Sequence, residues 1–309
     1  MTRDELQKLA ADFSDQSPYN YLGMDGESMS SDEAARNNYA KNNLMNAGHS
    51  PEMFDIDDFG EFAGMRFFEQ PIFSACQAGD PLFRDIKRPE VVGAHHTLPE
   101  DWLPEAKTVL SFFLPYSHPI VEANRKDPVV PPIEWLYTRV DGQKFLLALG
   151  AEMCKVLIAD NHKAVVPYTD DKFVMRVGGP ATPGTEHIPQ FSSNWSERHV
   201  AYVAGLGTFG LSTNFISKLG SAGRLISVVT DWDVEPDIRD YDNWLGYCNH
   251  CEACIRRCPP KAHYKDKVGK DHEKCSMFIG EICKPFTPRY GCGKCQSGIP
   301  CEYQPMKAK

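Results

Sequence analysis

The stretch "YCNHCEACIRRCPP" (residues 247–260) places four cysteines, Cys248, Cys251, Cys254 and Cys258, within eleven residues. Their spacing, C-x2-C-x2-C-x3-C-P, is that of bacterial two-cluster ferredoxins, in which the fourth cysteine binds the other cluster. A zinc site usually has two CxxC pairs separated by a loop, and stable disulfides are uncommon in the cytoplasm. The spacing therefore favours iron–sulfur clusters over zinc or disulfides.

A second cluster needs three more thiol ligands, and five cysteines remain downstream. The pair in "GCGKC" (291–295) has the tight spacing that can hold one cluster. We assign one 4Fe–4S cluster to Cys248, Cys251, Cys254 and Cys301, and the other to Cys258, Cys275, Cys292 and Cys295. Cys283 is left over, although Cys283 and Cys275 could exchange roles. His250 is expected to tune the first cluster or to contact solvent rather than to ligate.

The cysteines divide the chain into two parts, because nine of the eleven fall in the last 62 residues. We expect an α/β body over residues 1–240 and a double 4Fe–4S, ferredoxin-like module over residues 241–309. Of the two remaining cysteines, Cys154 lies in an expected helix as a small buried hydrophobe. Cys76 could be the same, although its neighbours resemble a loop.

Charge changes at the same boundary. Residues 248–309 contain twelve Lys and Arg against six Asp and Glu, and the whole chain carries −9, so the remainder carries −15. A basic module suits an acidic electron donor such as ferredoxin or flavodoxin, although lysines that only solubilise the module would give the same pattern. The acidic body argues against a nucleic-acid partner.

The N-terminus indicates a cytoplasmic protein. Its sequence "MTRDELQKLAADF" lacks an apolar core and a twin-arginine pair, and Thr2 and Glu5 have the spacing of a capping box. The chain has no run of 18 apolar residues, so no membrane span is expected.

The body alternates strand and helix signals. Runs at 107–115, 163–168 and 224–231 predict strands, and residues 133–160 have apolar side chains at helical spacing. A shorter helix is predicted after Asn194, which would cap it together with Glu197. Strands separated by helices indicate an α/β layer fold.

Two stretches before the cysteines, "SERHVAYVAGLGTFGLSTNFIS" (196–217) and "GRLISVVTDWDVEP" (223–236), complete a recognisable pattern. Together with the cysteine run they resemble epoxyqueuosine reductase and, more distantly, the reductive dehalogenases, over roughly residues 105–305. The resemblance implies a nitroreductase-like, cobalamin-binding α/β domain followed by a two-cluster ferredoxin-like module. It also supports Cys301 as the ligand that completes the first cluster, although five residues separate Cys295 from Cys301 where the family has three.

The resemblance implies that a corrinoid lies against the "GLGTFG" segment and its surroundings. Glycine permits close approach of the backbone to a flat ligand, although these glycines could equally close a helix onto the sheet. The positions that match family residues or suit this role are Gly205, Gly207, Gly210, Ser212, Thr213 and Ser227. No D-x-H-x-x-G motif is present, since "DNHKAV" (160–165) lacks its glycine. That absence fits a base-off cobalamin without a histidine ligand, or no corrinoid.

The family's aspartate proton donor would stand at Phe191, so another residue must donate protons. We name Tyr137, Arg139 and His199 as candidates, because a tyrosine beside a cation can act as an acid; each could instead be structural.

Three functions remain open. The first is a cobalamin-dependent reductase of a small organic substrate. The second is an electron-transfer protein that reduces the corrinoid of a partner protein, and the third is a tRNA epoxyqueuosine reductase.

Overall fold

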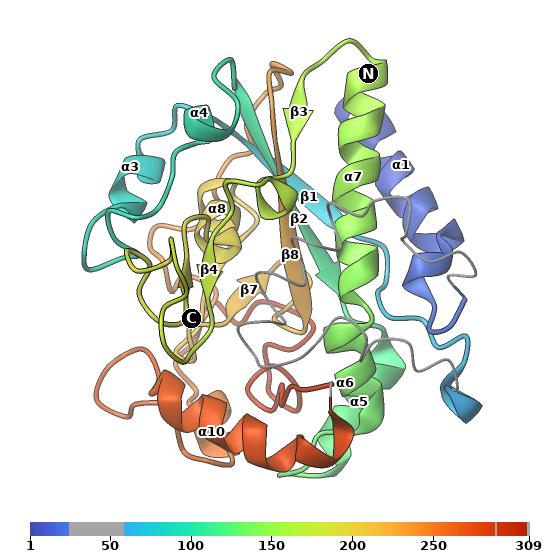
Figure 1. The fold of residues 1–309 in the computed structure, drawn as a ribbon, viewed down its shortest axis with the longest axis vertical. Coiled ribbons are helices and arrows are strands. Elements are labelled where there is room, and N and C mark those ends of the chain that lie inside the picture. The colour runs from blue at the N-terminus through green and yellow to red at the C-terminus, as the bar shows by residue number, and fades with distance from the viewer. Residues whose placement is uncertain (25–58, 288, 308–309) are drawn as a thin grey trace.

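The computed structural model describes residues 1–24, 59–287 and 289–307 (Figure 1). Residues 15–70 are polar and have few periodic signals in sequence, and most of them lie outside these ranges. The α-helices are α1 (Arg3–Gln16), α3 (Leu82–Ile86), α4 (Pro99–Trp102), α5 (His118–Lys126), α6 (Ile133–Val140), α7 (Gln143–Ala159), α8 (Glu197–Val203), α9 (Ala253–Arg257) and α10 (His272–Ile282). The strands are β1 (Ile72–Gln77), β2 (Thr108–Pro115), β3 (Ala164–Val165), β4 (Met175–Arg176), β5 (Ser192–Ser193), β6 (Gly207–Phe209), β7 (Phe215–Ser217) and β8 (Gly223–Thr230).

A four-stranded sheet in the order β1-β2-β8-β3 forms the centre, and every pairing in it is antiparallel. The long strand β2 is buried on both faces, and its side chains alternate between them. Leu110 and Phe112 join a hydrophobic cluster on one face, whereas Val109 joins a second cluster on the other. The sheet is therefore the middle layer of a mixed α/β fold.

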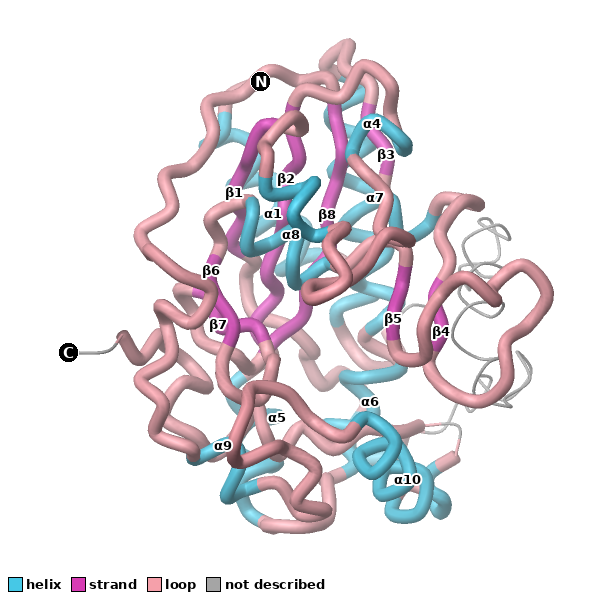
Figure 2. Tube along the Cα trace, turned by 90° about the vertical axis from the view of Figure 1, so that its left-hand side faces the viewer, coloured by secondary structure: helices cyan, strands magenta, loops and turns pink. Residues whose placement is uncertain are grey.

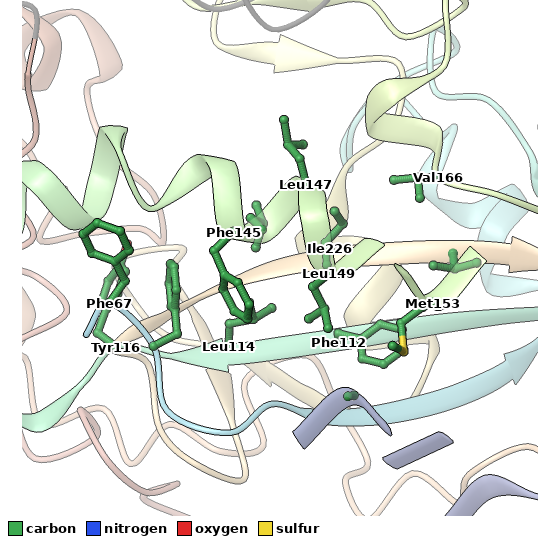
Figure 3. Close-up of a cluster of buried hydrophobic side chains, with 14 of the residues drawn as sticks. Phe67, Phe112, Leu114, Tyr116, Phe145, Leu147, Leu149, Met153, Val166 and Ile226 are labelled. Carbon is green, nitrogen blue, oxygen red and sulfur yellow. The ribbon is translucent and has the colours of Figure 1, made fainter. Parts of the chain in front are cut away.

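Helices cover both faces of this sheet. Helix α7 packs on β8 with α1 beside it, and α8 packs on β8 from the opposite side (Figures 1 and 2). Figure 3 shows Phe145 and Leu149 of α7 beside Leu114 and Phe112 of β2. Their burial removes a continuous apolar surface from water, which is the main source of stability here.

The strands predicted at 107–115 and 224–231 are confirmed as β2 and β8. The strand predicted at 163–168 is shorter, because β3 ends at Val165 and a 3₁₀ helix (Pro167–Thr169) follows. A proline has no N–H to donate to a sheet, so Pro167 cannot extend the ladder.

The helical stretch predicted at roughly 133–160 is confirmed with one interruption, because Asp141 and Gly142 divide it into α6 and α7. The amides of both residues bond to the Tyr137 carbonyl, at 2.7 and 3.1 Å. Arg289 holds the Asp141 carboxylate through two hydrogen bonds of 2.7 and 2.9 Å. A β-carbon at Gly142 would come within 3.1 Å of the Phe68 ring. The atom nearest to such a β-carbon is the Thr138 carbonyl oxygen, at 2.5 Å. Contacts within the preceding turn and contacts remote in sequence therefore both act at this break.

Local predictions had mixed outcomes. The capping box of Thr2 and Glu5 is present in α1. The predicted cap at Asn194 is wrong: Ser196 precedes α8, and the Asn194 side chain instead binds the backbone of Val174 and Lys172, at 2.9 and 2.8 Å. Cys76 lies in β1 with 2% of its surface exposed, rather than in a loop.

The cysteine-rich segment lies at one end of the sheet, with α10 near α5 and α6 (Figures 1 and 2). Besides the Arg289–Asp141 pair, an ion pair between Arg125 of α5 and Glu302 joins it to the body. The amide of Ser221 donates to the Cys301 carbonyl at 2.8 Å. Among the described residues, no helix has the length and apolar character needed to cross a membrane.

Candidate functional site

Four thiols, which we call the first thiol group, line one small pocket: Cys248, Cys251, Cys254 and Cys301. Cys251 is exposed, so this pocket reaches the surface of the protein. Burial raises the pKa of Cys254 to about 11 and that of Cys301 to about 12. The backbone hydrogen bond from Ser221 ties Cys301 to the body, and both residues line the pocket. The structure thus brings together the four residues that we assigned to one cluster.

Four other thiols, which we call the second thiol group, line a cavity of about 560 Å³: Cys258, Cys275, Cys292 and Cys295. The amide of Ala262 donates to the Cys258 sulfur at 3.3 Å, and the Asn214 side chain donates to the Cys295 sulfur at 3.1 Å. Such N–H···S contacts stabilise a thiolate. Cys295 also lines the first pocket, so the two sites are adjacent.

In the described ranges, no three metal-ligating side chains converge closely enough to hold a single ion. A 4Fe–4S cluster binds each thiolate to a different iron, so its ligands surround a cube rather than meet at one point. The residue chemistry and the grouping in fours fit that cofactor.

Cys283 lies apart from both groups. It is 3% exposed, and its sulfur donates to the Gly291 carbonyl at 3.3 Å. It lines neither the small pocket nor the cavity. This position agrees with the prediction that Cys283 is the spare thiol, a prediction that only metal analysis can test.

Lys294 stands between Cys292 and Cys295 and is fully buried. Its ammonium donates to the backbone and side-chain oxygens of Asn124, at 2.9 and 2.8 Å. Burial lowers the pKa of Lys294 to about 8. No carboxylate pairs with it in the described part of the chain, and a buried cation is costly without an anion nearby. Thiolates bound to a cluster would supply that negative charge.

The cavity wall is both aromatic and cationic. It contains six cations and one carboxylate, namely Arg139, Arg176, Arg198, Arg224, Lys270, Lys294 and Glu197. Its aromatic residues are Phe113, Tyr116, Trp135, Tyr168, Phe173, Phe191, Trp195, Phe215, Phe278 and Tyr290. A large, mostly apolar cavity with a few charged groups is typical of a cofactor or substrate site.

The residues predicted to contact a corrinoid do not line this cavity: Gly205, Gly207, Gly210, Ser212, Thr213 and Ser227. Gly210 and Ser212 instead line the small pocket of the first thiol group. Gly207 packs against the backbone of β7, where a β-carbon would lie 2.8 Å from the Ser217 Cα. Ser227 is buried in β8, and its hydroxyl accepts a hydrogen bond of 2.9 Å from Trp195. Their contact with a corrinoid stays a prediction.

Of the three candidate proton donors, only Arg139 lines the cavity. Its guanidinium lies 5.1 Å from the centre of the Tyr290 ring. Tyr137 is buried under Arg289, whose guanidinium lies 4.5 Å from its ring centre. His199 bonds to Ser196 at 2.8 Å, and burial lowers its pKa to about 3. Tyr137 and His199 therefore occupy structural positions beside the cavity, and their role in catalysis stays a prediction.

Glu197 was not singled out in the sequence. It lines the cavity at the start of α8, and its carboxylate oxygens are buried without a hydrogen-bond partner in the described residues. Burial raises the pKa of Glu197 to about 7, against a smaller opposing effect from nearby Ser227. The sequence signal that could have indicated Glu197 as a site residue is its position in "WSER", directly before the cavity residue Arg198.

Phe191, at the place of the family's aspartate, also lines the cavity. Its backbone has φ 61°, an uncommon value for a bulky residue, and its ring stacks on His272 at 5.2 Å. This stack joins the loop before α8 to the start of α10.

A comparison with protein-family models gives no match. Among curated proteins, an epoxyqueuosine reductase from Leadbetterella byssophila is 29% identical over 128 residues, which cover 37% of this chain and 38% of that protein. Among solved structures, a selenomethionine-labelled epoxyqueuosine reductase has a TM-score of 0.48 at 19% identity, over 77% of this chain and 65% of that one. A catabolic reductive dehalogenase in complex with 3-bromo-4-hydroxybenzoic acid has a TM-score of 0.46 at 14% identity, over 76% and 30%.

The resemblance to epoxyqueuosine reductase inferred from the sequence is confirmed, since a curated epoxyqueuosine reductase is among the proteins to which this chain is similar. The chain spans less than two thirds of each of these three relatives. Because the chain covers only part of these proteins, their reductase activity enters below as a proposal for this chain.

Proposed function

We propose that the chain is a cytoplasmic iron–sulfur reductase with two 4Fe–4S clusters and a corrinoid in the large cavity, acting on a small organic substrate. One observation supports the proposal: eight cysteines line two adjacent sites that share Cys295, of which one reaches the surface and the other is a cavity of about 560 Å³. The enzyme class follows from the reductases to which the chain is similar.

In this proposal the first thiol group holds one cluster near the surface, and the second thiol group holds the other at the cavity wall. The clusters would supply one-electron transfer between a donor and the cavity. The donor would be an acidic ferredoxin or flavodoxin that approaches the basic cysteine-rich module.

The size of the cavity supports its role as a ligand or cofactor site. Its volume lies within the range of roughly 300–1,000 Å³ that cofactor and ligand pockets occupy. Gly223, Gly291 and Gly293 lie in its wall. A corrinoid would supply cobalt-centred reduction, and the body would then correspond to the nitroreductase-like domain of the resembling families. If no corrinoid is held, the chain is an electron carrier that reduces the corrinoid of a partner protein.

A tRNA epoxyqueuosine reductase is a second candidate, favoured by the name of the curated relative. Phe191 stands where that family has its aspartate, and the body is acidic, so the small-molecule reductase is the stronger proposal.

Anaerobic purification followed by metal analysis and an absorption spectrum tests this function. We expect about eight iron and eight acid-labile sulfide per chain. After cobalamin addition and desalting, we expect one corrinoid per chain, and the paramagnetic resonance of its cob(II) form should lack nitrogen splitting. Iron near four, or stoichiometric zinc, would contradict the two-cluster proposal. Full clusters without corrinoid uptake would favour the electron carrier.

A further inference from the structure

One end of the cavity gathers basic side chains from two parts of the chain. A short hairpin follows Cys258, where His263 and Lys270 face each other across an antiparallel bridge. The bridge is supported by hydrogen bonds from Asp271 to Ala262 at 2.8 Å and from Tyr264 to Gly269 at 3.1 Å. Partners across such a bridge carry their side chains on one face of the hairpin.

Two more basic residues adjoin this pair. His272 starts α10, two residues beyond Lys270, and interacts electrostatically with Lys270 and Arg198. Arg198 comes from α8 in the body and donates to the Thr213 carbonyl at 2.7 Å. All four side chains line the cavity: Arg198, His263, Lys270 and His272.

The electrostatic partners of the two cations include thiols of the second group, because Cys295 interacts with Arg198 and Cys275 with Lys270. Within the described residues, neither Arg198 nor Lys270 forms an ion pair with a carboxylate. The neighbouring Asp271 caps α10 by accepting from the Lys274 amide at 2.9 Å. His263 is 6% exposed, and its Nδ1 is buried with no hydrogen-bond partner in the described part of the chain. Two cations beside an unsatisfied, buried ring nitrogen create a strong preference for an acceptor with negative charge.

We infer that this end of the cavity is a subsite for a phosphate-like anion, formed by Arg198, His263, Lys270 and His272. The arginine and lysine provide charge, and the imidazoles provide directed hydrogen bonds. Burial and Lys270 lower the pKa of both histidines to about 4, with a further contribution from Arg198 at His272, so both are neutral and each carries one N–H donor.

Two sources could provide the anion. The choice between them rests on the proposed function, whereas the existence of the subsite does not. One is the phosphate in the nucleotide tail of a corrinoid, and the other is an anionic group on the substrate. Cobalamin and cobinamide distinguish them, because cobinamide lacks the nucleotide and its phosphate. Inorganic phosphate tests the subsite without any corrinoid.

The test uses the full chain with its iron content measured, in phosphate-free buffer, and equilibrium dialysis with labelled inorganic phosphate. Lys270→Gln should weaken phosphate binding about tenfold or more, the effect of losing one charged hydrogen bond. Lys270→Arg should retain binding. Lys265→Gln, an equal charge change on the same hairpin but at an exposed position, should leave binding within about twofold of the unmodified protein.

Corrinoid titrations then identify the source. Loss of cobalamin affinity in Lys270→Gln with unchanged cobinamide affinity assigns the subsite to the cofactor phosphate. Loss of phosphate affinity with both corrinoids unchanged assigns it to the substrate. If Lys270→Gln loses iron, Arg198→Gln replaces it in the same comparison. Absence of phosphate binding, with equal cobalamin affinity in all variants, overturns the subsite. Failure of corrinoid uptake alone counts against the proposed function instead.

Discussion

The two thiol groups lie side by side and share Cys295 in their walls, yet their surroundings differ in charge. The lining of the first pocket contains one carboxylate, Glu252, and no cation among the described residues. The cavity of the second group has six cations and one carboxylate. Positive surroundings favour the more negative, reduced form of a redox centre. If clusters occupy both groups, this difference draws electrons from the surface toward the cavity.

The largest effect should come from removing a thiol of one group. Cys258→Ser should reduce iron from about eight to about four per chain, because it removes a ligand of the second cluster only. The matched control is Cys283→Ser, which removes a buried thiol outside both groups and should leave iron unchanged. Anaerobic iron and sulfide analysis measures both variants. Equal iron loss in the two would mean that the second group is assigned wrongly.

The second prediction concerns how the segment near the second group is held. Arg289→Ala should lower the free energy of unfolding by about 3–5 kcal/mol, because it leaves the buried Asp141 carboxylate without its partner. Anaerobic denaturant unfolding of the cluster-loaded protein measures this change. A loss below about 1 kcal/mol would show that the break between α6 and α7 does not depend on this ion pair.

The third prediction addresses the charge difference directly. Lys294→Gln should lower the reduction potential of one cluster by on the order of tens of millivolts, since it removes a buried cation beside two of its ligands. Redox titration followed by paramagnetic resonance measures both clusters. Lys284→Gln, at an exposed position, serves as the control. Equal shifts in the reduction potentials of both clusters in Lys294→Gln would contradict the proposed difference in electrostatic surroundings between the two groups.

The smallest effect is expected near the first group. Arg125→Ala should cost about 1 kcal/mol or less, because the Arg125 side chain is 38% exposed and its ion pair with Glu302 is screened by water. The same unfolding measurement applies, with Arg289→Ala as the comparison. A cost as large as that of Arg289→Ala would mean that both ends of the cysteine-rich segment are held equally firmly.

Local patterns predicted what depends on local chemistry. The β-branched runs gave β2 and β8, and Thr2 and Glu5 gave the cap of α1. Cysteine spacing singled out eight thiols that all line the small pocket or the cavity, and their division between two clusters stays a prediction. These features follow from periodicity and from ligand spacing, which neighbouring residues determine.

Long-range packing decided the rest. The break at Gly142 combines contacts within the preceding turn with contacts to Phe68 and Arg289, which lie far away in sequence. The cavity wall combines α8, the 262–271 hairpin and the 290–296 segment, so no single stretch could reveal that Glu197 faces it. The glycines of "GLGTFG" were expected at a cofactor, yet Gly207 makes room for the neighbouring strand.

The hydrogen bond from Ser221 to the Cys301 carbonyl has a consequence for assembly. Cys301, the last thiol of the first group, is held by Ser221 in the turn between β7 and β8. The α/β body therefore forms part of the scaffold of that site. A fragment containing only the cysteine-rich segment would lack this anchor. Of the four thiols in its first group, Cys301 would then lose the backbone contact that positions it. If the first group holds a cluster, we therefore expect the isolated segment to bind iron less tightly than the full chain.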